Sequence, residues 1–203
     1  MKKCEKCGAM MEQDALFCRE CGTRLSEIDS NYVNPQLSEI IDKHWSYSQD
    51  INCDIIFTVL SLQKSPNAAI QLITRKEDGM PLQLNFCLES STEGDSEILD
   101  KFRKSPYIKL VKPDGGEGLE EGDLSGIIDF GEDIEKAKQT ISLILRDVYS
   151  QDENDSIEYF IDKNGNEIER SAGYNNNSSS GGKSCMGVIV IIVTASALVA
   201  SLL

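Results

Sequence analysis

The feature that most constrains the fold is a pair of Cys-x-x-Cys motifs at the start of the chain. Cys4 and Cys7 form the first pair and Cys18 and Cys21 the second, and a glycine follows each pair directly. Two residues between paired thiolates allow a tight turn to aim both sulfurs at one ion, and glycine supplies the permissive backbone that such a turn requires. Four thiolates form a closed tetrahedral sphere, which suits one structural zinc ion and leaves no open position for a substrate.

Two other uses of the four cysteines fit the sequence less well. Disulfides form in oxidising compartments, but the first residues run into charged side chains and lack the apolar core of a signal peptide. An iron site of the rubredoxin kind would use the same turns, but no aromatic-rich domain of suitable size surrounds them. Because about 25 residues bury too little surface to fold unaided, we expect the metal to supply the folding energy of this segment.

The same segment carries further residues of a known pattern. Phe17 comes directly before the second cysteine pair, and Leu25 follows it closely. With the two Cys-x-x-Cys-Gly motifs, they make residues 1–25 resemble the short zinc ribbons at the amino termini of many bacterial proteins. The resemblance implies a small rigid unit that contacts proteins or nucleic acids. The net charge of this segment is only +1, so it offers no large basic patch, and protein contact is favoured.

The other end of the chain is apolar. Residues 184–203 contain no charged side chain, and twenty helical residues reach about 30 Å, the thickness of the hydrocarbon core of a bilayer. We therefore expect residues 184–203 to form a transmembrane tail anchor, joined to the body by a polar, flexible linker over residues 171–183. The alternative is a buried helix of a soluble protein, which would need a large apolar groove within the same chain.

The flanking charge predicts the orientation of this anchor. Lys183 is the only charged residue next to the apolar segment, and the positive-inside tendency then places the bulk of the chain in the cytoplasm, as a single-pass membrane protein. The reduced cysteines that zinc binding requires agree with this location. Cys185 would lie at the membrane boundary, where it could be acylated, although we expect an unmodified thiol.

The middle of the chain is strongly acidic. Residues 26–170 hold 14 basic and 30 acidic side chains, against a net charge of −14 for the whole chain. Such a surface repels the phosphates of nucleic acids and anionic lipid headgroups, so sequence-independent nucleic-acid binding by this region is not expected. We expect this charge mainly to keep the domain soluble, and basic patches on other proteins stay open as partners.

The periodicity of apolar residues predicts an α+β domain over residues 35–170, after a linker over residues 26–34. Helical spacing predicts helices at residues 37–45, 96–103 and 134–148. Apolar or alternating runs predict strands at residues 69–74, 82–88, 107–111, 124–130 and 157–161. Residues 55–60 fit either type. Short connections favour an antiparallel sheet with helices covering one face. In element order alone, this domain resembles the secretion-chaperone fold, which implies an interaction or chaperone-like role.

Few side chains of this domain could carry a reaction. His44 is the only histidine and lies on an apolar helical face beside Trp45, which favours packing over catalysis. Cys53 and Cys87 lie in apolar segments, where buried thiols behave as small hydrophobic groups. A nucleophilic pair of Cys53 and His44 stays open, without a third residue to support it. The acidic, glycine-rich residues 115–123 are expected to form a solvated connection rather than a phosphate or calcium site.

The sequence thus favours a non-enzymatic, tail-anchored membrane protein. Its zinc ribbon and acidic α+β domain would face the cytoplasm and bind a protein partner, in an adaptor or chaperone-like role. A second interpretation is a membrane-tethered regulator whose zinc ribbon binds nucleic acid, and a third is a hydrolase that uses His44 or Cys53. No small-molecule substrate is evident from the sequence.

Overall fold

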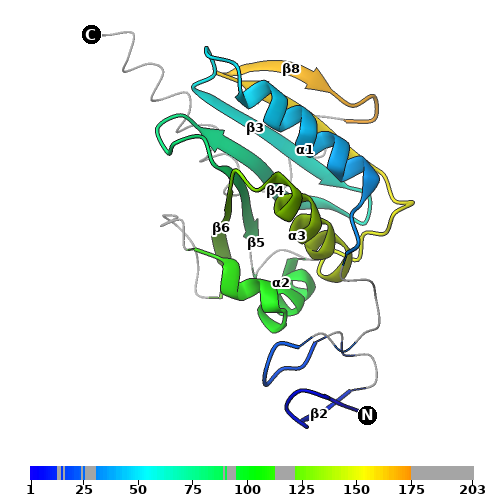
Figure 1. Ribbon diagram of the computed structural model, residues 1–203. Coiled ribbons are helices and arrows are strands. Elements are labelled where there is room, and N and C mark those ends of the chain that lie inside the picture. The colour runs from blue at the N-terminus through cyan, green and yellow to red at the C-terminus, as the bar shows by residue number, and fades with distance from the viewer. Residues whose placement is uncertain are drawn as a thin grey trace.

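The computed structural model describes most of the chain up to residue 174. The described residues are 1–12, 15, 17–23, 25, 31–88, 90, 95–112 and 122–174. The ribbon segment begins with a short antiparallel hairpin of β1 (Lys2–Lys3) and β2 (Met10–Met11). It projects from one end of the larger α+β body (Figure 1).

A six-stranded antiparallel sheet forms the centre of the body. Its strands are β3 (Ile55–Leu62), β4 (Ser65–Arg75), β5 (Leu82–Leu88), β6 (Leu124–Gly131), β7 (Ile157–Lys163) and β8 (Asn166–Arg170). The spatial order is β6-β5-β4-β3-β7-β8, so β3 to β6 form a meander and β7 returns beside β3. Asn164 and Gly165 form the turn that joins β7 to β8, and both have positive φ, 54° and 81°.

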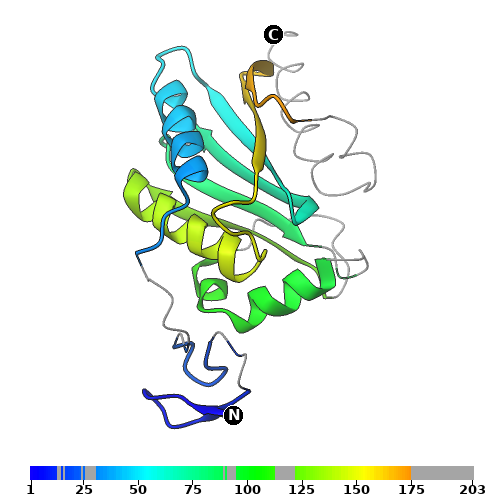
Figure 2. The ribbon, with the colours of Figure 1, turned by 90° about the vertical axis from the view of Figure 1, so that its right-hand side faces the viewer.

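Two long helices cover one face of this sheet. Helix α1 (Pro35–Ser48) lies over β3, β4 and β7, and α3 (Ile134–Asp147) lies beside it over β5 and β6 (Figures 1 and 2). Helix α1 begins at Asn34, whose Oδ1 accepts from the Leu37 N–H at 3.0 Å. Asp133 caps α3 in the same way, with Oδ1 3.1 Å from the Lys136 nitrogen. Such caps satisfy backbone donors that the first helical turn leaves unpaired.

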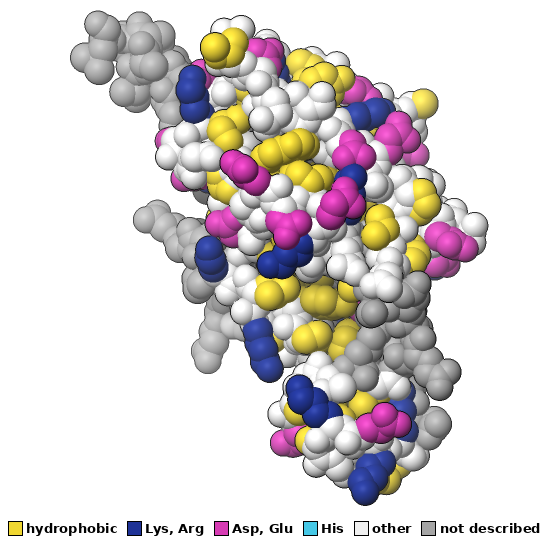
Figure 3. Space-filling model, viewed as in Figure 1, with side chains coloured by type: hydrophobic (Ala, Val, Ile, Leu, Met, Phe, Trp, Pro, Cys, Tyr) yellow, Lys and Arg dark blue, Asp and Glu magenta, His cyan; other side chains and the backbone are white. Residues whose placement is uncertain are grey.

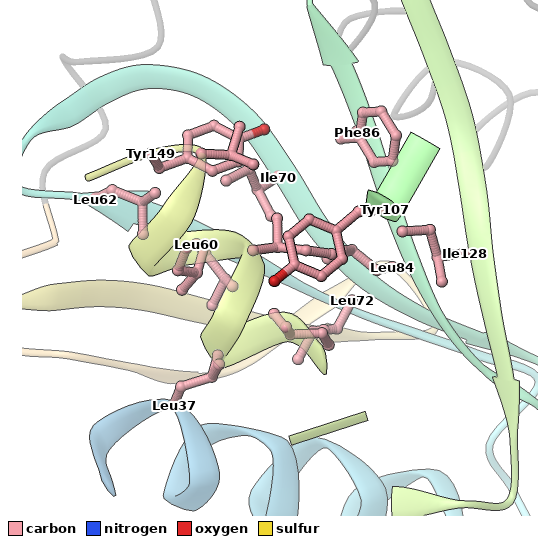
Figure 4. Packing of buried hydrophobic residues seen from close by; sticks show 14 of the residues in the cluster. Leu37, Leu60, Leu62, Ile70, Leu72, Leu84, Phe86, Tyr107, Ile128 and Tyr149 are labelled. Atoms are coloured by element: carbon pink, nitrogen blue, oxygen red, sulfur yellow. The ribbon is translucent and has the colours of Figure 1, made fainter. Parts of the chain in front are cut away.

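The main core fills the space between these helices and the sheet (Figure 4). Fully buried leucines and isoleucines come from both layers: Leu37, Ile41, Leu60, Leu62, Ile70, Leu72 and Leu84. Helix α2 (Asp95–Lys104) closes one end of this core, where the rings of Phe102 and Phe86 lie 4.8 Å apart. Burial of each large apolar side chain contributes about 1.5–3 kcal/mol, so this layer contact dominates the stability of the body.

One predicted strand is wrong. Pro106–Leu110 forms a short 3-10 helix, η1, and only Lys112 pairs with the sheet, through an isolated bridge to Ile127. The alternating apolar residues around Tyr107 imitate a strand pattern. Pro106 occupies the first helical position, where its fixed φ and missing N–H suit a helix start. The ambiguous residues 55–60 belong to strand β3.

The burial of strand β5 also differs from the expectation. Leu82, Leu84, Phe86 and Leu88 alternate with polar residues, which predicts a strand with one solvated face. All seven residues of β5 are buried, including Gln83 and Asn85. Both faces of β5 are therefore withdrawn from water.

Several expectations concern residues outside the described ones. They are the anchor over residues 184–203, the linker from residue 175 on, Cys185, and residues 115–121 of the glycine-rich connection. Among the residues that are described, no helix has both the length and the apolar character needed to cross a bilayer.

Candidate metal centre

Each cysteine pair lies in a turn of the same design. The Gly8 N–H donates to the Cys4 carbonyl at 2.8 Å, and the Gly22 N–H donates to the Cys18 carbonyl at the same distance. A second backbone bond, donated by the first cysteine of each pair, closes each turn at 2.8 Å. The two glycines have φ of 77° and 67°, which a residue with a Cβ adopts only with strain. The glycine after each pair is therefore a requirement of the turn.

The two turns bring their four sulfurs together. The Sγ atoms of Cys4, Cys7, Cys18 and Cys21 all lie within 4.8 Å of one another. The Cys4–Cys21 Sγ separation is 3.6 Å and the Cys7–Cys18 separation 3.4 Å. A tetrahedral zinc ion with Zn–S bonds of about 2.3 Å sets its sulfurs about 3.8 Å apart. The donor set and its spacing thus fit one zinc ion, and four soft thiolates suit zinc over magnesium or calcium.

Thr23 supports the thiolate form of one of these cysteines. The Thr23 hydroxyl lies 3.1 Å from the Cys21 Sγ. Hydrogen bonds with the Thr23 side chain and backbone lower the pKa of the Cys21 thiol from 9.0 to about 6. A backbone bond with Ala9 lowers the pKa of Cys7, but hydrogen bonds with the Cys18 and Cys21 thiols outweigh it and raise that pKa to about 12. Because zinc binds thiolates, metal binding at this site must release protons.

The ribbon has almost no core of its own. Among the described residues of the ribbon, its own cluster buries Met11 and two of the cysteines, with Ala9, Ala15, Cys21 and Leu25 partly buried around them. Phe17 instead belongs to the core cluster of the body. Its ring packs edge-on against Tyr107 at 5.8 Å between centroids, and the Tyr107 hydroxyl donates to Asp147 at 2.7 Å. A single aromatic side chain of the ribbon therefore enters the core of the body.

The neighbouring turn touches the same element. A Cβ on Gly22 would lie 3.5 Å from the Lys109 Nζ and 3.8 Å from the Pro106 Cβ, so the second cysteine turn rests on η1. The sequence marked Phe17 as part of the ribbon pattern but carried no sign of this docking, because its partner lies 90 residues away in a segment predicted as a strand.

The structure does not bring His44 and Cys53 together as a reactive pair. His44 is fully buried, with Nδ1 2.8 Å from the Thr58 hydroxyl and Nε2 3.1 Å from the Thr74 hydroxyl. Burial lowers the pKa of His44 to about 3. Cys53 lies in a separate apolar cluster with Ile56, and burial raises the pKa of its thiol. Both environments disfavour the ionised forms that acid–base or nucleophilic catalysis uses.

A polar cluster that sequence reasoning missed ties β8 to α1. Glu169 Oε1 accepts from Lys43 Nζ at 2.8 Å and from the Tyr159 hydroxyl at 2.7 Å, and its Oε2 accepts from the Tyr47 hydroxyl at 2.8 Å. These donors lower the pKa of Glu169 to about 2, and the same contacts raise the pKa of Lys43. The four residues come from three separate segments, so no local motif announces them.

Comparison with known proteins identifies the ribbon alone. The family model of the zinc-ribbon domain matches residues 3–25. No curated protein and no solved structure matches the chain. The expected ribbon and its capacity for one zinc ion are therefore confirmed. The resemblance of the α+β body to the secretion-chaperone fold gains no support.

Proposed function

We propose that this protein is a non-enzymatic adaptor, tethered to a membrane by residues 184–203, that binds a protein partner in the cytoplasm. The observation that carries the proposal is the placement of the zinc ribbon. It projects from one end of the body, where basic and acidic side chains lie side by side on its surface (Figure 3). A metal-stiffened projection that carries both signs of charge can match the charges of a protein partner.

The chemistry of the metal centre supports a structural role for zinc. Its four cysteine ligands would complete the coordination sphere, as in sites where zinc stabilises a fold, whereas catalytic zinc keeps a position for water. The buried environments of His44 and Cys53 likewise support a non-catalytic role for the body. In this adaptor, the ion holds the contact surface in shape and takes no part in turnover.

The charge of the body indicates the kind of partner. Residues 26–170 carry a net charge of −16, which attracts basic protein surfaces and repels nucleic acids. The apolar tail would keep ribbon and body close to one membrane surface and so raise their effective concentration for a partner there.

Capture from solubilised membranes tests this function. The intact protein, a form ending at residue 183 and the variant Cys18→Ser would each be used as bait, with Cys53→Ser as a matched cysteine control. We expect the intact protein and C53S to recover the same partner, and the other two forms to lose it. Flotation with phosphatidylcholine vesicles should carry the intact protein and leave the shortened form behind. A partner recovered equally by all four forms, or an intact protein that never floats, contradicts the proposal.

A further inference from the structure

The sheet surface turned away from α1 and α3, which we call the far face, carries both apolar and amide side chains. Alternation along the strands separates it from the side that faces the helices, because Thr58 on β3 points to His44 of α1 while its two neighbours belong to a different apolar cluster. The far face comprises Phe57, Val59, Gln71, Ile73, Gln83, Asn85 and Phe160.

Strand pairing makes these residues one continuous patch. Ile73 pairs with Phe57 on one side and with Gln83 on the other. One step along, Gln71 pairs with Val59 and with Asn85 in the same way. Residues paired directly across strands share a face, so the apolar side chains of β3 and the amide side chains of β5 flank Gln71 and Ile73 of β4 on the same face.

The patch is buried although no described helix lies over it. Its members on β3, β4 and β5 are at most 8% exposed, while α1 and α3 pack on the opposite side (Figure 2). The buried oxygens Gln83 Oε1 and Asn85 Oδ1 receive no hydrogen bond within the part of the chain that the structure describes. A suitable cover must therefore combine apolar side chains with a few hydrogen-bond donors, since buried amides are costly when unpaired.

The course of the chain leads to this surface. The Tyr174 ring packs against Phe160 at 5.0 Å, so the last described residue already lies at the edge of the far face. Residues 175–183 can extend to about 30 Å. From β7 to β5 the sheet advances by three strand spacings, about 14 Å. The linker is long enough to bring residues 184–203 across the whole patch.

We infer that residues 184–203 dock on the far face whenever no bilayer holds them. The segment is uncharged and apolar, and the hydroxyls of Thr194 and Ser196 can donate to the buried amide oxygens. The short tether gives this segment a higher effective concentration at the patch than any separate chain. The inference goes beyond the proposed adaptor function, because docking requires only the tail and the sheet.

Two cysteines allow this contact to be tested in the zinc-loaded full chain. Cys87 pairs with Ala69 of β4 and Ser125 of β6 and lies two residues from Asn85, on the same side of β5 as the far face. Cys185 lies near the start of the apolar segment in the sequence. In vesicle-free buffer the protein should stay monomeric. The structure has Cys87 in a disulfide, so the protein is first reduced. After reoxidation with diamide and non-reducing digestion, a peptide that joins Cys87 to Cys185 within one chain is expected. A mixture of isotopically light and heavy protein separates this link from links between copies.

Variants of the tail serve as matched controls that leave the body untouched. Ile191→Asp puts a charge in the docking segment and should lower the yield of the link several-fold, whereas Ser179→Asp puts the same charge in the linker and should not. Three results would overturn the inference: a link between Cys185 and Cys53, links that form only between copies, or aggregation of the protein without vesicles.

The membrane arm separates this inference from the adaptor proposal. Phosphatidylcholine vesicles should compete for the tail and reduce the link between Cys87 and Cys185 in the intact protein. A link in buffer without flotation would support docking and contradict the membrane tether. Flotation without any link in buffer would support the membrane tether and contradict docking.

Discussion

His44 shows how a single buried residue sets the response of the body to acid. A neutral imidazole donates from one nitrogen and accepts at the other, so the Thr58 and Thr74 hydroxyls can satisfy both. The ring thereby joins α1 to the two central strands. A proton on His44 would place a charge in the core, and burial lowers its pKa from 6.5 to about 3 for this reason.

The first prediction concerns the pH dependence that His44 causes. Between pH 6.5 and 3 the unfolded chain binds a proton at His44 that the folded chain does not, so stability should fall as pH falls. The limit for one group is about 1.4 kcal/mol per pH unit. His44→Gln should lower stability at pH 7 and flatten this slope in urea unfolding between pH 7.5 and 4.5. An unchanged slope would count against the assignment.

Glu169 predicts a second, more acidic transition. Its pKa is lowered from 4.5 to about 2, so its contribution is complete above pH 4.5 and is lost as the pH falls towards 2. Because the side chains of Lys43 and Glu169 are partly exposed, we expect Glu169→Gln to cost only about 1 kcal/mol at pH 7. Glu167→Gln, which removes an exposed pair with Arg170 on the same strand, is the control and should cost less. Equal losses would show that the cluster adds nothing.

At the scale of elements, the sequence predicted the features that depend on residues close together in the chain. The cysteine turns need only residues that are near in sequence, and the apolar faces of α1 and α3 are visible as helical spacing, so these features could be predicted. The contact of Phe17 with Tyr107 and the cluster around Glu169 depend on distant segments. The expected solvated face of strand β5 was wrong for a similar reason: Gln83 is polar, but the tertiary arrangement buries it.

The docking of the ribbon gives a prediction at this scale. Phe17→Ala removes the ring that packs into the body, and an aromatic pair contributes about 0.5–1.5 kcal/mol beyond its buried area. We expect zinc content to stay at one ion per chain, because Phe17 is not a ligand, while amide exchange at residues 107–110 of η1 becomes faster. Met10→Ala, at an exposed position of the same ribbon, is the control. Loss of zinc in F17A, or protection of η1 that matches the control, would contradict this division of roles.

At the scale of the whole molecule, the two parts obtain their stability in different ways. The body has a large apolar core between helices and sheet, whereas the buried cluster of the ribbon is small and includes two metal-binding cysteines. Structural zinc supplies about 10–16 kcal/mol of binding free energy in small zinc domains. The ribbon therefore depends on its ion and the body does not, although Phe17 connects them.

Removal of the metal should unfold the ribbon and leave the body folded. A strong chelator, or Cys18→Ser, should abolish amide protection at Cys4, Gly8 and Gly22, whose N–H groups close the turns, because no ion then holds the two turns together. Protection in β3, β4 and β5 should persist, with a small loss of stability from the released Phe17. Hydrogen exchange of loaded and chelated protein measures both regions at once, and C53S controls for the loss of a thiol. Cooperative unfolding of the sheet on chelation would mean that ribbon and body form one folding unit, and zinc would then be a stabiliser of the entire molecule.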